Sequence, residues 1–391
     1  MKSRFLLILG MVCLLAGLLV VFNFDRFAPW FNGQAVAAAA NEPTAATGPW
    51  YMVYLPVMGM EFNVLVLLAI GFSVGVLGGF FGMGGAWIVT PGLNIFGFNM
   101  AFAIGTDLAH IYGKSIVATI KHSKMGNVDI LLGIILSVGA AIGVEIGAMN
   151  VMWLERIGLV GPVIRIIYMI LLFGLGFYMV YEYFTATKKR KTVVAKTPTT
   201  AAEQAGLGSR PGLAARLQQM QLPPMIHFKM SGVTISLWVI VAVAVFTGWL
   251  SGLLGVGGGF IRMPALIYLI GVPTAVAVGT DLFSVIFSGA YGCVTFGLKG
   301  RVELIAAMWM LLGATVGAQI GVSAVKYIRG YGIRLLFALM ILVAGATVLL
   351  KQVQLNQAAQ IIILASALVV CLVIIIRLVQ GIGQERRSKR V

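Results

Sequence analysis

The chain has 391 residues, of which 60% are hydrophobic and only 10% are charged, and its mean hydropathy is +1.00. Soluble globular domains carry about 25% charged residues. The composition of this chain therefore excludes a soluble globular domain and predicts a protein embedded in a lipid bilayer. The formal net charge of +16 comes from basic residues in loops and tails beside apolar spans, a pattern typical of cytoplasmic segments of membrane proteins. We therefore expect a bilayer as partner and no nucleic acid.

Residues 1–60 predict a membrane anchor followed by an extracytoplasmic segment. The chain opens with Lys2 and Arg4 and continues as an apolar helix to residue 22, which fits either a retained anchor or a cleaved signal peptide. The alanine-rich stretch 35–40 lies far beyond the apolar core, which favours retention. Residues 23–60 are rich in Pro, Ala and Gly, and we expect them to stand outside the transport machinery.

The rest of the chain repeats itself on either side of a basic segment. GMGGAWIVTP at 82–91 matches GVGGGFIRMP at 255–264, Gly-Thr-Asp-Leu at 105–108 recurs at 279–282, and Gly-x-Val-acid at 126–129 recurs at 300–303. This organisation predicts a first transmembrane repeat at 61–184, a basic cytoplasmic linker at 185–230 and a second transmembrane repeat at 231–351. A C-terminal helix and basic tail follow at 352–391.

The apolar segments predict an all-α polytopic membrane protein. The long segments are 62–82, 99–120, 128–150 and 160–184, then 233–255, 273–297, 302–326 and 331–350, and finally 358–380. Four crossings per half would give parallel repeats and place the basic tail outside, against the positive-inside tendency. If the short apolar pieces 86–97 and 260–271 also return across the membrane, the halves are inverted and the tail lies inside with the linker. We predict two inverted five-segment repeats with Gly-broken helices, plus extra N- and C-terminal helices, although Lys299 and Arg301 then fall outside.

Glycine-rich interruptions at matching positions of the two halves, 78–85 and 252–259, indicate a binding site in a transporter. A helix that starts after such a break directs free N–H groups and the positive end of its dipole into the membrane interior, where they favour an anion. The alternative is close helix packing, because small residues let membrane helices approach one another. Pro91 and Pro264 favour a real break.

Polar residues form a stripe on the helix that follows each break. One helical face holds Asp107, His110, Lys114 and Lys121, and the aligned residues in the second half are Asp281, Ser284, Ser288 and Thr295. Ionisable residues within a membrane usually face a cavity or a partner, so we expect these stripes to line the pathway. The predicted substrate-binding residues are Gly84, Gly85, Thr106, Asp107, His110, Lys114, Gly257, Gly258, Gly259, Arg262, Thr280, Asp281, Ser284 and Ser288.

Each candidate also has a purely structural interpretation. The two aspartates can pair with Lys114 or Arg262, Lys121 can reach the interface, and a membrane histidine is more often a packing residue than a proton carrier. Asp129 and Glu303 at helix starts, and Arg165 and Arg334 near span ends, are predicted to be structural. The glycine series at 139, 143 and 147 and at 313, 317 and 321 is assigned to helix packing, and the role of Glu145 is left open.

The paired Gly-rich breaks ending in proline, followed by Gly-Thr-Asp-Leu and Gly-x-Val-acid, resemble the TauE/SafE family of sulfite and organosulfonate exporters over about residues 64–350. The resemblance implies a plasma-membrane permease that exports sulfite, a sulfonate or a related small sulfur-containing anion. It does not specify the substrate. The chain departs from the family pattern at Asp107 and Asp281, where many members have a small polar residue.

These observations favour a secondary carrier that works by alternating access at the interface of the repeats, and they leave open whether protons are coupled and whether the chain forms a homodimer. An anion channel, or a carrier of another small anion, remains the alternative. No GxxxxGK[ST], HExxH or clustered Cys/His ligands occur, so ATP-driven transport by this chain, an enzyme, a cofactor and a metal site are not expected.

Overall fold

The computed structural model describes residues 51–81, 86–193, 223–327 and 331–388. The N-terminal anchor, most of the linker and the end of the tail lie outside the described residues, as do Gly84 and Gly85. The first half contains β1 (Met52–Leu55), β2 (Met60–Asn63), α4 (Val64–Phe81), α5 (Ala86–Ile95), α6 (Met100–Lys124), α7 (Ile130–Arg156) and α8 (Val160–Val193). The second half contains β3 (Met225–Phe228), β4 (Val233–Ser236), α10 (Leu237–Leu254), α11 (Gly259–Ala265), η1 (Leu266–Ile270), α12 (Thr274–Leu298), α13 (Leu304–Tyr327), α14 (Tyr331–Gln352) and α15 (Asn356–Ser388).

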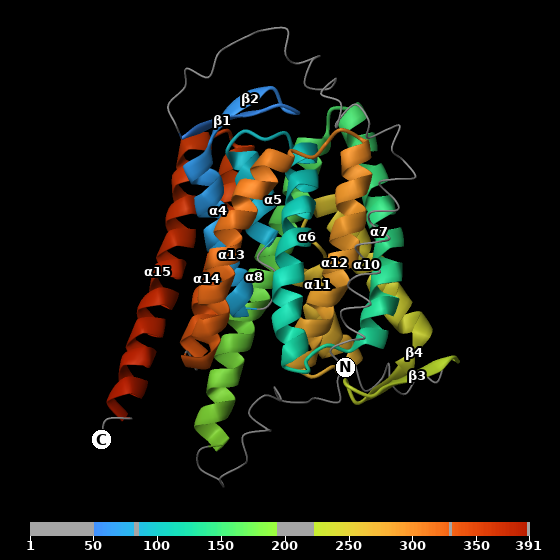
Figure 1. Cartoon of the computed structure of the whole chain (residues 1–391), viewed down its shortest axis with the longest axis vertical. Helices are drawn as coiled ribbons and strands as arrows, with labels where there is room; N and C mark the ends of the chain where they lie inside the picture. Colours follow the sequence, from blue (N-terminus) through green and yellow to red (C-terminus); the bar gives the residue numbers. More distant parts are fainter. Residues whose placement is uncertain (1–50, 82–85, 194–222, 328–330, 389–391) are drawn as a thin grey trace.

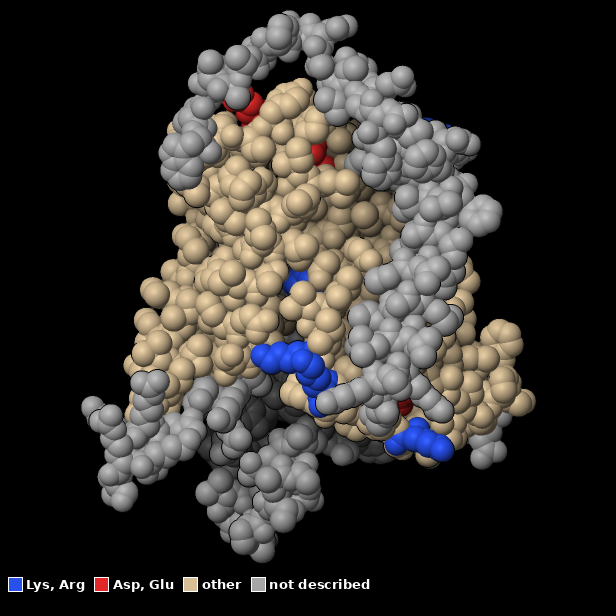
Figure 2. Space-filling model, in the orientation of Figure 1, with Lys and Arg blue, Asp and Glu red and all other residues tan. Residues whose placement is uncertain are grey.

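The helices form a polytopic membrane protein, as predicted. Within the described ranges, 6 helices are long and apolar enough to cross a bilayer, namely α7, α8, α10, α12, α13 and α15. Shorter apolar stretches occur in α4 and α14. The middle of the face in Figure 2 is almost free of charged side chains, whereas basic side chains gather near its lower end. This distribution matches a body surrounded by lipid.

Two short helices follow the glycine-rich breaks. α5 has 10 residues and contains Pro91, and α11 has 7 residues before it continues into the 5-residue π-helix η1. A helix of this length spans about 15 Å, half of a hydrocarbon core about 30 Å thick. Each is therefore long enough for only part of a bilayer. That 86–97 and 260–271 return across the membrane stays a prediction.

The closest helix pairs join the two halves. α4 packs along α13, α10 packs along α7, and α6 packs against α12 (Figure 1). Glycines make these approaches possible: a Cβ on Gly143 would lie 2.2 Å from the carbonyl oxygen of Val245, and one on Gly317 would lie 2.2 Å from that of Phe72. The assignment of both glycine series to helix packing is confirmed.

Each half begins with a β-hairpin that the sequence did not reveal. In the first hairpin's turn, the N–H groups of Val57 and Met58 donate to the Glu303 carboxylate at 2.9 and 3.3 Å. In the second, the N–H and hydroxyl of Ser231 donate to Asp129 at 3.2 and 2.8 Å. Residues 52–60, predicted to stand outside the machinery, therefore dock onto the second half of the chain. The β1–β2 hairpin lies at the top of Figure 1 and the β3–β4 hairpin at the bottom.

Candidate functional site

The polar stripe of α6 is buried in the body of the molecule. The side chains of Asp107 and His110 are fully buried and that of Lys114 nearly so. Asp107 accepts a hydrogen bond from the Thr90 hydroxyl of α5 at 2.8 Å, and its other oxygen lies 3.5 Å from His110 Nδ1. Lys114, also on α6, interacts electrostatically with Asp107. The sequence prediction that these three side chains share one face is confirmed.

A second polar cluster surrounds Arg262 of α11, whose side chain is fully buried. Its Nη1 donates to Ser284 Oγ at 2.6 Å and lies 3.6 Å from Asp281 Oδ1. Its Nε donates to Thr247 Oγ1 at 3.2 Å. Arg262 Nη2 has no hydrogen-bond partner among the described residues. The guanidinium is thus held by a carboxylate and two hydroxyls, and one donor edge is left over.

Glycines of the second break bring this cluster close to the main chain. Gly255, Gly257 and Gly258 have φ of 79°, 66° and 76°, which residues with a side chain rarely adopt. A Cβ on Gly258 would lie 2.3 Å from Arg262 Nη2, and one on Gly259 would lie 2.5 Å from Asp281 Oδ2. Arg262 Nη2 therefore lies directly against the backbone of Gly258.

The second break also packs against the first polar stripe. A Cβ on Gly255 would lie 2.6 Å from the Thr90 hydroxyl that binds Asp107, and one on Gly257 would lie 3.0 Å from Ile111 of α6. The Tyr168 hydroxyl of α8 donates to the carbonyl oxygen of Leu254, the last residue of α10. The two polar clusters are therefore neighbours, one on each half of the chain.

Thr106 and Thr280, also predicted to bind substrate, hold the two halves together. Thr106 Oγ1 accepts the N–H of Glu303 at 3.0 Å, and Thr280 Oγ1 accepts the N–H of Asp129 at 2.9 Å. The preceding glycines, Gly105 and Gly279, lie against the same loops, where a Cβ would be about 2 Å from a carbonyl oxygen. Gly-Thr of one half thus binds Gly-x-Val-acid of the other, and we assign these threonines to docking.

The remaining residues of the second stripe lie along α12. Ser284 and Ser288 are fully buried, and the Ser288 hydroxyl donates to the Ser284 carbonyl oxygen at 3.4 Å. Glu145, whose role the sequence left open, lies 3.5 Å from Lys299 Nζ and accepts a hydrogen bond from Thr295 at 3.1 Å. Glu145 therefore serves the α7–α12 contact. Sequence reasoning missed Thr90, although it lies in the repeated motif 82–91, because its counterpart in the second half is Met263. It missed Thr247 and Tyr168 because these neutral residues belong to no motif.

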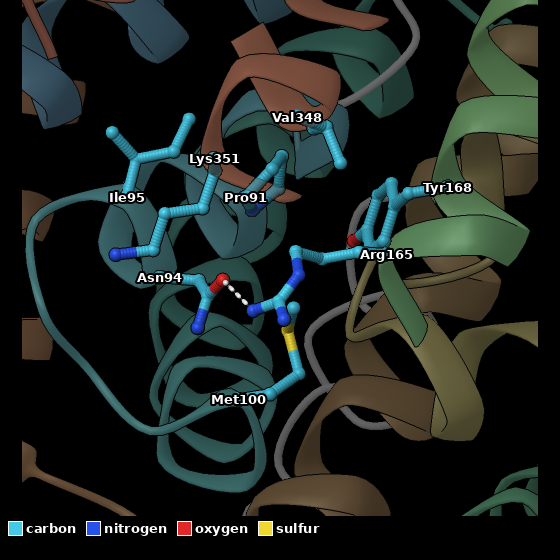
Figure 3. Close-up of a pocket in the computed structure, with 8 residues that line it drawn as sticks. All are labelled: Pro91, Asn94, Ile95, Met100, Arg165, Tyr168, Val348 and Lys351. Atoms are coloured by element: carbon cyan, nitrogen blue, oxygen red, sulfur yellow. Dashed lines mark hydrogen bonds between the residues drawn. The ribbon is translucent and has the colours of Figure 1, made fainter. Parts of the chain in front are cut away.

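A narrow depression lies beside the clusters, between α5, α8 and α14 (Figure 3). Pro91, Asn94, Arg165, Tyr168 and Lys351 contribute to its lining. Arg165 Nη1 donates to Asn94 Oδ1 at 3.4 Å, and Arg165 Nε donates to Gln352 Oε1 at 2.7 Å. These bonds join α8 to α5 and α14, which agrees with the structural role that the sequence predicted for Arg165.

One protein-family model matches the part of the chain that holds the glycine-rich breaks and the buried polar clusters. Residues 67–348 fit the family described as Sulfite exporter TauE/SafE. The chain belongs to this family. The resemblance drawn from the motifs alone is thereby confirmed, and this TauE/SafE chain is a membrane transporter by family and not an enzyme.

Curated relatives of this TauE/SafE chain are distant. The probable membrane transporter protein YunE of Bacillus subtilis is 25% identical over 301 residues, which cover 73% of this chain and 96% of that protein. A probable membrane transporter protein of Xylella fastidiosa is 28% identical over 257 residues, 64% of this chain and 79% of its own length. The Sulfite exporter TauE/SafE family protein 3 of Arabidopsis thaliana is 35% identical over 82 residues, 21% of this chain and 17% of its own. No solved structure matches the chain.

Proposed function

We propose that the protein is a secondary transporter that exports a small sulfur-containing anion, sulfite or an organosulfonate, by alternating access between two inverted repeats. Family membership and the names of its relatives support a transporter of this substrate class. The observation that carries the proposal is the buried Arg262, whose Nη2 has no hydrogen-bond partner among the described residues and lies beside the second glycine break.

Arg262 suits a sulfite or sulfonate group on chemical grounds. Such an anion loses strong hydration on entering the membrane, and charge-assisted hydrogen bonds of roughly 1.5–3 kcal/mol each are needed to offset that loss. The guanidinium supplies Nη2, and the Ser284 hydroxyl, which accepts from Arg262 Nη1, keeps its own proton to donate. Lys114 supplies a second cation from the first stripe. Asp281 beside Arg262 holds the guanidinium in place and limits the net charge while no anion is bound.

Alternating access is supported by reciprocal contacts between the halves. The α4–α13 contact has its equivalent in α10–α7, and the Thr106–Glu303 bond has its equivalent in Thr280–Asp129. The hairpins at opposite ends in Figure 1 agree with halves of inverted orientation. In this arrangement the two polar clusters lie between the halves, where a rocking motion exposes them to each side in turn.

Proton coupling follows from the Asp107–His110 pair. Asp107 Oδ1 and both ring nitrogens of His110 are buried and lack hydrogen-bond partners among the described residues, although Oδ1 and Nδ1 lie only 3.5 Å apart. A proton added to this pair converts an unsatisfied contact into a charge-assisted hydrogen bond. The other groups that face it are Lys114 on α6, Thr90 on α5 and Tyr168 on α8. We propose this pair as the site of the coupling proton.

We place the protein in the cell membrane, with the linker and the C-terminal tail in the cytoplasm. The basic residues of both segments favour this orientation. The lower ends of α8 and α15 point the same way in Figure 1, which agrees with it.

The test is counterflow of radiolabelled sulfite in proteoliposomes that contain the purified protein. A carrier accumulates label transiently against an excess of internal unlabelled anion, and its flux saturates. The channel alternative gives flux without counterflow. Absence of any sulfite or sulfonate flux would reject the substrate class.

A further inference from the structure

Ion pairs link the two halves at the end of the molecule that holds the β1–β2 hairpin. Arg301, in the loop between α12 and α13, donates from Nε to both carboxylate oxygens of Glu155 on α7 at 2.9 Å. Its guanidinium also lies over the Phe102 ring of α6, 5.1 Å from the ring centroid. Lys299 Nζ, in the same loop, lies 3.5 Å from the carboxylate of Glu145 on α7. This loop of the second half is therefore bound through its charges to two helices of the first half.

The equivalent positions at the opposite end of the molecule are neutral. In the repeat alignment, three of the charged residues have uncharged counterparts, namely Met125 for Lys299, Asn127 for Arg301 and Gln319 for Glu145. The docking hydrogen bonds, in contrast, occur at both ends, from Glu303 N–H to Thr106 and from Asp129 N–H to Thr280. The two ends therefore share their docking contacts and differ in these ion pairs.

The ion pairs act together on one short loop. Their four charged side chains are only 19% to 33% exposed, so water screens them less than it screens charges on an open surface. One such pair alone contributes little, but moving this loop away from α6 and α7 breaks both pairs and the contact with Phe102. In a carrier with two states, contacts present at one end only stabilise the state that is closed at that end.

We propose that the Arg301–Glu155 and Lys299–Glu145 pairs form an outer gate, which holds the extracytoplasmic end of the transport route closed and separates when that end opens. The same loop binds the β1–β2 turn through Glu303, at the upper end of the molecule in Figure 1. The proposal rests on the alternating access and the orientation proposed above, and not on which anion is carried. A gate at the outer end alone favours a resting state that opens toward the cytoplasm, where an exported anion is loaded.

The test measures the distance across the outer gate in the full-length chain by double electron–electron resonance, in lipid nanodiscs without added sulfite or sulfonate. Spin labels are attached at Trp153→Cys on α7 and Leu304→Cys at the start of α13, with the native cysteines replaced by Ala. Both side chains are exposed, at 60% and 41%, so a label at either position does not disturb the interior.

The variants compared in this background are Glu155→Gln, Arg301→Gln and the charge exchange Glu155→Arg with Arg301→Glu. Arg156→Gln is the matched control, because Arg156 is an exposed charged residue next to Glu155. Each neutral variant is expected to raise the ratio of the long-distance to the short-distance population by about 3- to 10-fold. The charge exchange is expected to reverse this shift, since the pair forms again with opposite polarity. Arg156→Gln is expected to match the parent chain.

A salt titration of the parent chain tests the gate without any substitution at the ion pairs. Raising the salt concentration from about 0.1 M to about 1 M shortens the screening length from roughly 10 Å to 3 Å. The long-distance population of the parent is expected to grow with salt. This arm decides the question if a gate variant does not fold.

An unchanged distance distribution in both Glu155→Gln and Arg301→Gln, or in the parent at high salt, overturns the gate. A shift that the charge exchange does not reverse also overturns it, because the contact then depends on shape and not on charge. Since the measurement needs no anion, its result is separable from the proposed function. The expected shifts in a chain without sulfite or sulfonate flux retain the gate and reject the substrate class, whereas sulfite counterflow without any shift retains the carrier and rejects the gate.

Discussion

At the scale of single residues, Arg262 and Lys114 have different surroundings although both are buried cations. Arg262 is fixed by Asp281, Ser284 and Thr247, which leaves one edge of its planar fork for a ligand. Lys114 instead acts on Asp107 of its own helix. A fixed guanidinium loses little conformational freedom on binding an oxyanion, so Arg262 is the better anchor.

Replacement of Arg262 by Gln is expected to weaken sulfite or sulfonate affinity by about 10-fold or more, because one charge-assisted hydrogen bond is lost. Lys114→Met is also expected to weaken this affinity, because a positive charge is lost. Lys121→Met is the control, since Lys121 reaches the interface and is expected to leave affinity unchanged. Isothermal titration calorimetry on the purified variants measures the effect. Unchanged affinity in both the Arg262 and Lys114 variants would remove the cations from the site.

Replacement of His110 by Gln is expected to abolish accumulation driven by a pH gradient and to preserve exchange of one anion for another, since Gln carries no transferable proton. Methanesulfonate is the appropriate substrate, because a sulfonate stays ionised across the neutral range whereas sulfite itself takes up a proton there. His227→Gln is the control, because His227 is an exposed residue of β3 bonded to Thr234. A His110 variant that still accumulates methanesulfonate on a pH gradient would exclude this proton site.

At the scale of elements, glycines perform two separate tasks. On α7 and α13 they let helices of the other half approach until backbone carbonyls touch Cα atoms. At the second break they permit backbone angles that place Arg262 and Asp281 against the main chain. A Cβ on Gly317 would meet rigid backbone first, whereas one on Gly258 would first meet the movable end of the Arg262 side chain. Substitutions at these two positions should therefore have different effects.

Gly317→Ala is expected to destabilise the protein by about 1–3 kcal/mol, because its Cβ would lie 2.2 Å from the Phe72 carbonyl oxygen and neither helix can yield locally. Gly174→Ala in α8 is the matched control, since nothing lies within 4 Å of its Cβ. That control is expected to be stabilising by roughly 0.5–1 kcal/mol from helix propensity. Thermal unfolding in detergent compares them, and equal midpoints would contradict the packing assignment.

Gly258→Ala is expected to lower anion affinity with a smaller loss of stability than Gly317→Ala. Its Cβ would lie 2.3 Å from Nη2 at the movable tip of Arg262, which must shift away from its position. The φ of 76° adds a strain of roughly 1 kcal/mol for a residue with a side chain. Calorimetry and thermal unfolding on the same sample separate the two effects. Wild-type affinity in this variant would show that the position of Arg262 does not matter for binding.

The sequence predicted the helices well because long apolar runs and glycine-rich breaks are local signals. It also placed Asp107, His110 and Lys114 on one face, which follows from helical periodicity alone. It could not assign Thr106 and Thr280 to docking, because their partners are backbone N–H groups of Glu303 and Asp129, far away in the chain. The hairpins were missed for the same reason: their strands of 4 residues are stabilised by contacts with the opposite half.

At the scale of the whole molecule, the exceptions to the positive-inside tendency have a structural explanation. Lys299 and Arg301 fall on the outer side in the inverted arrangement. Lys299 lies 3.5 Å from Glu145, and Arg301 lies 2.9 Å from Glu155 and stacks over the Phe102 ring. The bias that sets orientation is the excess of Lys and Arg, which is larger in the linker and the tail than in the loop that holds these two residues. The inverted arrangement is therefore consistent with these two residues.

The two hairpins provide the sharpest test of that arrangement, because equivalent hairpins of inverted halves must face opposite sides of the membrane. In a background with Cys13, Cys293 and Cys371 replaced by Ala, we expect Tyr54→Cys to react with a membrane-impermeant maleimide in intact cells. Tyr54 and Met230 are both exposed, at 48% and 44%, so reactivity reports sidedness and not burial. Met230→Cys, Thr200→Cys in the linker and Ser388→Cys near the C-terminus should react only after permeabilisation, because the proposed orientation places all three on the cytoplasmic side. Labelling of both hairpins from the same side would rule out inverted halves. Labelling of the linker and tail from opposite sides would rule out an even number of crossings between them, and with it the scheme of five crossings in the second half plus one last span.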